Sequence, residues 1–216
     1  MKTEPLTSAT RQMRCLVVFG RRLSARFPCP VGLEIARSPP LRVASYVNGK
    51  ARTAPTTMKM TIIKYRNWEL IVDRETTQMA YDKVSNGSAE SCNCNDCKNF
   101  ANYRESVYPN EIKQLFVDLG IDYKKESEVS HFARLDSGLH FYSGWFHFKG
   151  QFKGKDCTVP IQGGGHMTDL YKVSDSFSLG FRGDNALTFF DDKENLVQIE
   201  FEAKIPWTIE KELESE

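Results

Sequence analysis

Apolar and polar side chains alternate along residues 197–205, and this period of two restricts the possible folds more than any other feature. The alternation predicts a β-strand that is buried on one face. The side chains expected to face water are Gln198, Glu200, Glu202 and Lys204. Similar strand-like runs precede it from residue 139 onward, separated by short polar turns. Strands joined in this way pair antiparallel, because a parallel pair needs a long crossover.

The residues before these strands show a helical period instead. In the segment 109–119 the apolar residues follow i, i+3, i+4, i+7 spacing: Ile112, Leu115, Phe116 and Leu119. Pro109 suits the first turn of this helix, and Gly120 suits its closing cap. A helix with Asn95 or Asp96 as N-cap is expected directly before it. The sequence therefore predicts an α+β fold, with an antiparallel sheet of about six or seven strands and a helical pair inserted after the first strand.

Charge divides the chain into two unlike parts. Residues 1–57 hold ten of the 29 basic and two of the 28 acidic side chains, so the remainder holds 19 basic and 26 acidic ones. We expect a disordered or spurious extension over 1–57, a single domain over 58–209 and a charged, frayed tail over 210–216. The extension fits translation from Met58 or Met60, an Arg-rich transit peptide, or a native disordered tail.

The composition of residues 58–216 excludes several classes of protein. Their acidic balance argues against a nucleic-acid interface, which needs a basic face. No run approaches the roughly 18 apolar residues of a membrane-spanning helix. Without an export signal, the six cysteines are expected to be reduced thiols in the cytoplasm.

Three cysteines within six residues form the one sharp chemical feature: Cys92, Cys94 and Cys97. They lie where a loop is expected to enter a helix, so that three sulfurs can face a common point. Thiolates suit Zn²⁺, which needs a fourth ligand to complete a tetrahedron. The spacing predicts a structural zinc site in a small binding or interaction module, with an unknown protein or small molecule as partner. Inert thiols are the alternative.

The fourth ligand is left open among five residues: Cys157, His131, His140, His147 and His166. His140 and His147 are an odd number of residues apart, so on a regular strand they face opposite sides of the sheet and cannot bind the same ion. Each of the five also has an ordinary structural interpretation, as a buried or surface side chain.

Two other functions are compatible with the sequence, although no residue requires catalysis to explain it. Cys94 and Cys97 have the C-x-x-C spacing of a thiol-redox couple. His166 follows three glycines and has Asp169 nearby, which is compatible with a general base of a hydrolase on a mobile loop. This glycine run lacks the Lys-Ser/Thr of a phosphate-binding loop.

Four segments together resemble an uncharacterised bacterial family of small cytoplasmic proteins. They are the C-x-C-x-x-C-x-N-F run at 92–100, the helix that begins near Pro109 and ends at Gly120, the Gly-Trp-Phe-His-Phe strand at 144–148, and the closing Ile-Pro-Trp at 205–207. The resemblance covers the chain from Met58 and none of 1–57, which favours a start near Met58. It implies no activity, cofactor or catalytic residue.

Overall fold

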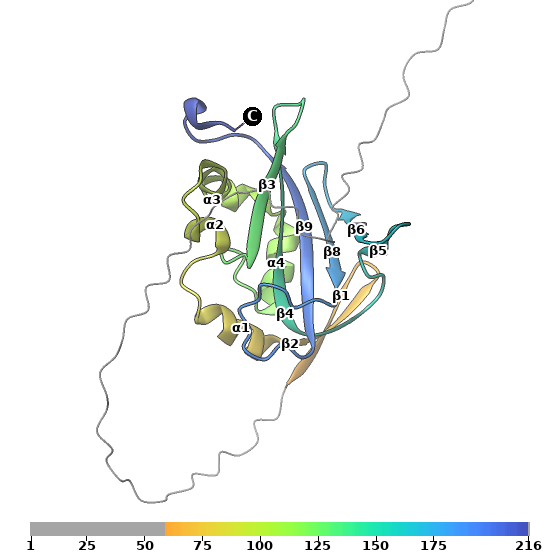
Figure 1. Cartoon of the computed structure of the whole chain (residues 1–216). Coiled ribbons are helices and arrows are strands. Elements are labelled where there is room, and N and C mark those ends of the chain that lie inside the picture. The colour runs from red at the N-terminus through yellow and green to blue at the C-terminus, as the bar shows by residue number, and fades with distance from the viewer. Residues whose placement is uncertain (1–58, 216) are drawn as a thin grey trace, which may run out of the picture.

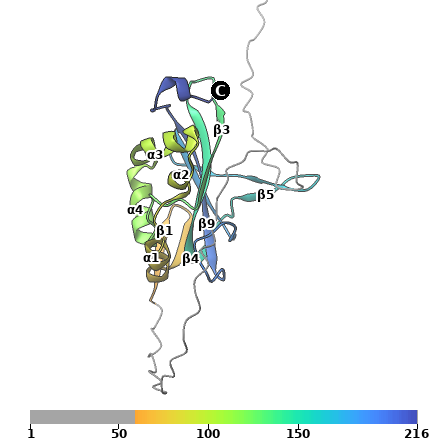
Figure 2. The same cartoon turned by 60° about the vertical axis from the view of Figure 1, so that its left-hand side comes forward.

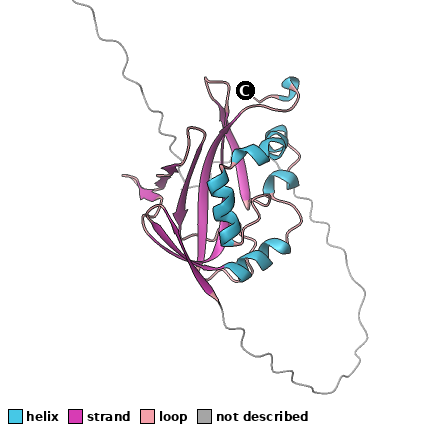
Figure 3. Cartoon of the chain, turned by 180° about the vertical axis from the view of Figure 1, so that it is seen from behind, coloured by secondary structure: helices cyan, strands magenta, loops and turns pink. Residues whose placement is uncertain are grey.

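The structure is a computed structural model that describes residues 59–215, so the predicted extension over 1–57 lies outside the described residues. Within 59–215, four α-helices cover one face of a seven-stranded antiparallel sheet (Figures 1 and 3). This arrangement confirms the predicted α+β fold. The helices follow a first hairpin rather than a single first strand, because Arg66, with a φ of 52°, begins a tight turn that pairs the two opening strands.

The strands of the main sheet are β1 (Met60–Tyr65), β2 (Trp68–Asp73), β3 (Glu128–Arg134), β4 (His140–Lys153), β7 (Tyr171–Lys172), β8 (Phe177–Arg182) and β9 (Leu196–Ile205). They run in the order β1-β2-β4-β9-β8-β7. One edge of β4 pairs with β9, and the other edge pairs first with β3 and then with β2. A separate hairpin, β5 (Thr158–Pro160) and β6 (His166–Thr168), lies on the side away from the helices (Figure 2).

The helices are α1 (Arg74–Asp82), α2 (Ser88–Ser91), α3 (Asn95–Val107) and α4 (Asn110–Leu119). The prediction for α4 is confirmed: Pro109 is its N-cap, and Gly120 ends it in the left-handed conformation with a φ of 81°. The N-cap of α3 is Cys94, one residue before the expected Asn95. Among residues 59–215, no helix has both the length and the apolar character that crossing a bilayer requires.

Aromatic rings join the helices to the sheet. Tyr108, between α3 and α4, has its ring centroid 5.6–5.9 Å from those of Phe116, Phe146, Phe177 and Phe201. All five side chains are buried. Burying each such ring contributes about 2 kcal/mol. The cluster therefore fixes α3 and α4 over β4, β8 and β9.

On the sheet face away from the helices, the polar side chains of β9 are more buried than its alternation predicted. Gln198 and Glu200 were expected to face water, yet they are only 3% and 6% exposed. Gln198 contacts His147 of β4 at 3.1 Å, and Glu200 accepts from Arg182 of β8 at 3.3 Å. Long polar side chains on the neighbouring strands thus cover each other, which a strand's own sequence does not reveal.

The chain after β9 packs back against α3. The side chain of Asn99 holds this segment: its Oδ1 accepts from the backbone N of Thr208 at 2.7 Å, and its Nδ2 donates to the carbonyl of Pro206 at 3.2 Å. A short 3₁₀ turn, η1 (Lys211–Leu213), follows. These contacts join residues more than 100 positions apart, so no local pattern in the sequence predicts them.

Candidate metal centre

The three predicted cysteines converge at the entrance to α3. Their sulfurs all lie within 4.8 Å of one another. The sulfurs of Cys92 and Cys94 are 3.3 Å apart, and Cys94 Sγ accepts from the backbone N–H of Cys97 at 3.4 Å. This last contact makes Cys94 the N-cap of α3 and directs its sulfur toward the first helical turn. A cap therefore brings the three thiols together.

The sulfur separations are close to those of a zinc thiolate centre. With a Zn–S bond of about 2.3 Å, tetrahedral geometry places two sulfurs about 3.8 Å apart. The pair Cys92 and Cys94 needs to open by about 0.5 Å to reach that separation. Burial, followed by the neighbouring thiols of Cys94 and Cys92, raises the pKa of Cys97. A redox nucleophile needs a lowered thiol pKa, so the direction of this shift does not favour Cys97 as a redox nucleophile.

None of the five candidate fourth ligands belongs to the group that Cys92, Cys94 and Cys97 form among residues 59–215. Cys157 is buried under β8, where an added Cβ at Gly180 would meet its Cβ at 2.5 Å. His147 is buried on the opposite sheet face, where it contacts Ser127 and Gln198, and His166 is exposed on β6. His140 and His147 thus lie on opposite faces, as their odd spacing predicted.

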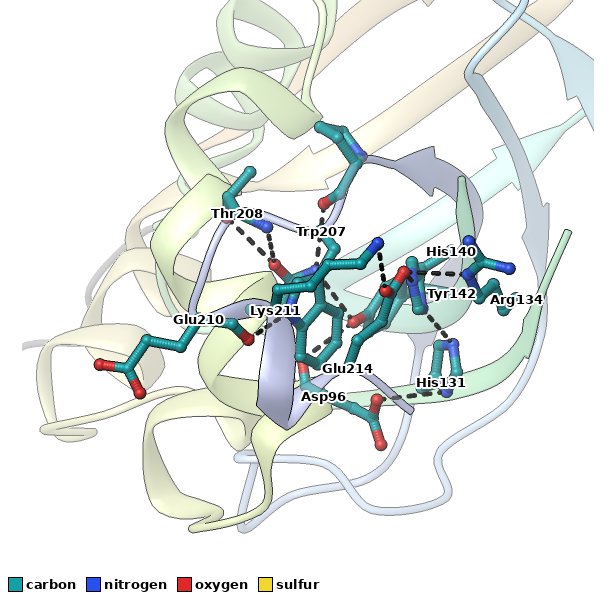
Figure 4. A network of polar contacts seen from close by, with 12 residues as sticks. Asp96, His131, Arg134, His140, Tyr142, Trp207, Thr208, Glu210, Lys211 and Glu214 are labelled. Carbon is teal, nitrogen blue, oxygen red and sulfur yellow. Dashed lines mark hydrogen bonds and ion pairs between the residues drawn. The ribbon is translucent and has the colours of Figure 1, made fainter. Parts of the chain in front are cut away.

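His131 and His140 form a second cluster, with Asp96 (Figure 4). His131 lies directly opposite Tyr142 in the pairing of β3 with β4, and His140 is two residues from Tyr142 on the same face. The two rings therefore meet diagonally across the strands. His140 Nδ1 and His131 Nε2 are 3.0 Å apart, and His131 Nδ1 is 3.4 Å from Asp96 Oδ1. Burial lowers the pKa of His131, and the carboxylate of Asp96 acts against this shift.

Glu214 closes the other end of this cluster. Its Oε1 is 3.1 Å from His140 Nε2 and accepts from Arg134 Nε at 2.9 Å (Figure 4). Hydrogen bonds from Lys211, His140 and Arg134 lower the pKa of Glu214 to about 2, so this carboxylate is ionised at neutral pH. The ring of Trp207 packs against His140 at a tilt of 40°, with 4.9 Å between ring centroids. The C-terminal segment thus covers the buried imidazole.

Sequence reasoning missed Asp96 and Glu214 as members of a site, and it treated His131 and His140 as competitors for one metal position. One signal was available for the two histidines. The turn-forming run Asp136-Ser137-Gly138 lies between them and predicts a hairpin that brings both onto neighbouring strands. No local pattern indicates Glu214, which is 74 residues from His140.

The groups named for a hydrolase do not assemble. Asp169 is paired with Lys155 at 2.5 Å rather than with His166. His166 lines neither the cavity beside the turn between β1 and β2 nor the cavity between α1 and α4. The hydrolase alternative therefore gains no support from the arrangement of residues 59–215.

Comparison of the chain with known family models, with curated proteins and with solved structures gave no significant match. The resemblance to a bacterial family with the C-x-C-x-x-C-x-N-F run accordingly stays a prediction. The local chemistry of the two clusters is what indicates a function: three thiols at the N-terminus of α3, and two imidazoles with carboxylates beside them.

Proposed function

We propose that the domain is a small cytoplasmic binding module in which Cys92, Cys94 and Cys97 hold a zinc ion. The observation that carries the proposal is the approach of the three sulfurs to within 4.8 Å of one another. Thiolates are preferred zinc ligands, and a dication relieves the repulsion among three such groups. The ion would fix the loop after α2 to the first turn of α3.

The fourth coordination position is the basis for a role in binding. Because no further residue of 59–215 belongs to the sulfur group, we assign this position to water or to a group on a partner. Cys94 is exposed, so a protein or small-molecule ligand can approach the ion. Reduced thiols persist in the cytoplasm, which is where the proposal places the protein, as a member of the bacterial family that its sequence resembles.

Thiol alkylation read out by mass spectrometry tests the proposal on the full chain. The reduced protein is alkylated with and without one equivalent of zinc, and the modification of each cysteine is measured separately. Zinc is expected to protect Cys92, Cys94 and Cys97 together. Cys94→Ser should abolish the protection of the other two, whereas Cys157→Ala should leave it unchanged, because Cys157 lies apart from the cluster.

Two outcomes would contradict the zinc proposal. One is equal alkylation of the three thiols with and without zinc. The other is a disulfide between Cys94 and Cys97 that forms and opens reversibly in metal-free protein with a defined reduction potential, which would favour the thiol-redox alternative.

A further inference from the structure

We propose that His131 and His140 form a second metal site, separate from the cysteines, that binds a divalent transition-metal ion and is oriented by Asp96 and Glu214. One possible ligand atom from each of His131, His140 and Asp96 lies within 4.8 Å of those of the other two. Imidazole nitrogen suits zinc, iron, cobalt or nickel. This site does not depend on the zinc site at the cysteines, because it shares no ligand with it.

Four side chains form an unbroken row: Asp96, His131, His140 and Glu214 (Figure 4). The three successive separations between facing atoms are 3.4, 3.0 and 3.1 Å. The row joins the first turn of α3 to β3, β4 and the C-terminal segment. His140 is fully buried, and the side chain of His131 is 10% exposed, so water does little to satisfy either ring.

With both imidazoles neutral, the row is one positive charge short of what its contacts need. Three contacts between facing atoms require three protons or cations, and two neutral imidazoles bring only two. If His140 donates to Glu214 and His131 donates to His140, then the lone pair of His131 Nδ1 faces Asp96 Oδ1. Asp96 Oδ1 is buried and has no hydrogen-bond donor in bonding geometry. If His131 instead donates to Asp96, two nitrogen lone pairs face each other at 3.0 Å.

A metal ion between the imidazoles supplies the missing charge. His131 then donates its outer N–H to Asp96 while His140 donates its outer N–H to Glu214, and both inner nitrogens turn their lone pairs to the ion. Metal-binding histidines characteristically donate their other N–H to a carboxylate in this way. With metal–nitrogen bonds of about 2.05 Å, tetrahedral geometry needs about 3.3 Å between the nitrogens, which is about 0.3 Å more than their present separation.

Both carboxylates orient the imidazoles rather than bind the ion. Asp96 Oδ1 lies 3.4 Å from the outer nitrogen of His131, where it holds that ring, and water fills the remaining positions at the ion. Glu214 is held by Arg134 and by Lys211 at 2.8 Å, and it acts by positioning His140 rather than by binding metal. Because Glu214 belongs to the C-terminal segment, metal affinity at this site depends on that segment being docked.

Cobalt titration of the full chain, followed by absorption spectroscopy, tests the proposal. Co²⁺ at the cysteines gives a sulfur-to-metal charge-transfer band, whereas Co²⁺ on nitrogen and oxygen gives only d–d bands. We expect two equivalents in the unmodified protein, one with the charge-transfer band and one without it. The triple variant Cys92→Ser, Cys94→Ser, Cys97→Ser should keep the second equivalent alone.

Single substitutions with a matched control identify the side chains that bind the second equivalent of cobalt. His131→Gln should remove it and leave the charge-transfer band intact, and Glu214→Gln should weaken its affinity by about 10–100-fold. His166→Gln, at an exposed histidine, should change neither equivalent. If the triple serine variant does not fold, the loss of only the second equivalent in His131→Gln decides the question.

Three results would overturn the proposal. The first is that no cobalt binds without charge transfer in the unmodified protein. The second is that His131→Gln removes the charge-transfer band, which would make His131 the fourth ligand of the cysteine centre. The third is that Glu214→Gln and His166→Gln have equal affinities. The first and third outcomes leave the zinc proposal for the cysteines intact, so the two proposals fail separately.

Discussion

His147 is a buried imidazole whose protonation should set part of the pH dependence of stability. It lies on the sheet face opposite the helices, with its Nε2 3.1 Å from Gln198 Oε1 and its Nδ1 3.3 Å from Ser127 Oγ. Gln198 donates its own amide to Glu200 at 2.7 Å, which fixes its oxygen toward the ring. The neutral ring is therefore satisfied on both nitrogens, by donating from Nε2 and accepting at Nδ1.

Burial lowers the pKa of His147 from 6.5 to about 4, although Gln198 and the more distant Asp184 act in the opposite direction. The unfolded chain thus binds this proton more tightly than the native state. The stabilisation is complete above pH 6.5 and is lost as the pH falls toward 4. At about 1.4 kcal/mol per pH unit, the full effect is about 3 kcal/mol, of which about 2 kcal/mol is lost between pH 7 and pH 5.

Urea denaturation at pH 7, 6 and 5 measures this effect in the unmodified protein and in His147→Gln. Buried carboxyl groups such as Glu126 and Glu200, whose pKa burial raises, add slopes of the opposite sign to both proteins. The difference between the two unfolding free energies cancels those slopes and should shrink by about 2 kcal/mol from pH 7 to pH 5. His166→Gln, at an exposed site, should run parallel to the unmodified protein. Parallel profiles for His147→Gln as well would refute the reasoning.

Two further predictions concern packing and buried charge. Gly144→Ala should lower the free energy of unfolding, measured by urea denaturation, by about 1–3 kcal/mol, because its Cβ would lie 2.3 Å from the backbone oxygen of Glu128. Its control is Gly183→Ala, which should be nearly neutral because the added Cβ would meet open space. Glu126→Gln should cost about 1–3 kcal/mol in the same assay, because the buried guanidinium of Arg104 loses its charged partner at 3.0 Å and keeps only the ion pair with the more exposed Glu90. The exposed Glu105→Gln is its control, expected to cost at most about 1 kcal/mol, and equal costs for the two would contradict the role of burial.

Local sequence predicted those elements whose determinants lie close together in the chain. The helix α4 carries its apolar stripe, its proline start and its glycine cap within twelve residues, and all of them act as expected. The cysteine cluster is equally local, because three sulfurs within six residues meet as soon as α3 begins at Asn95. Such features can be predicted without knowing which strands pair.

Features that depend on distant pairing were not predictable in the same way. The alternation in β9 identified two faces, but Gln198 is buried because His147 and Glu200 contact it. The second cluster needs the pairing of β3 with β4, which places His131 beside His140, and the return of the C-terminal segment, which brings Glu214 to His140. Each of these contacts arises from tertiary structure rather than from a period in the sequence.

X-ray absorption spectroscopy of the protein loaded with one equivalent of zinc tests the central claim most directly, since it counts the atoms bound to the metal. With three thiolate ligands, the first shell should contain three sulfur atoms at about 2.3 Å and one lighter atom. In Cys94→Ser the sulfur shell should be lost or reduced, while Cys157→Ala should retain it. A first shell of nitrogen and oxygen alone in the unmodified protein would contradict the assignment of the cysteines as the zinc site.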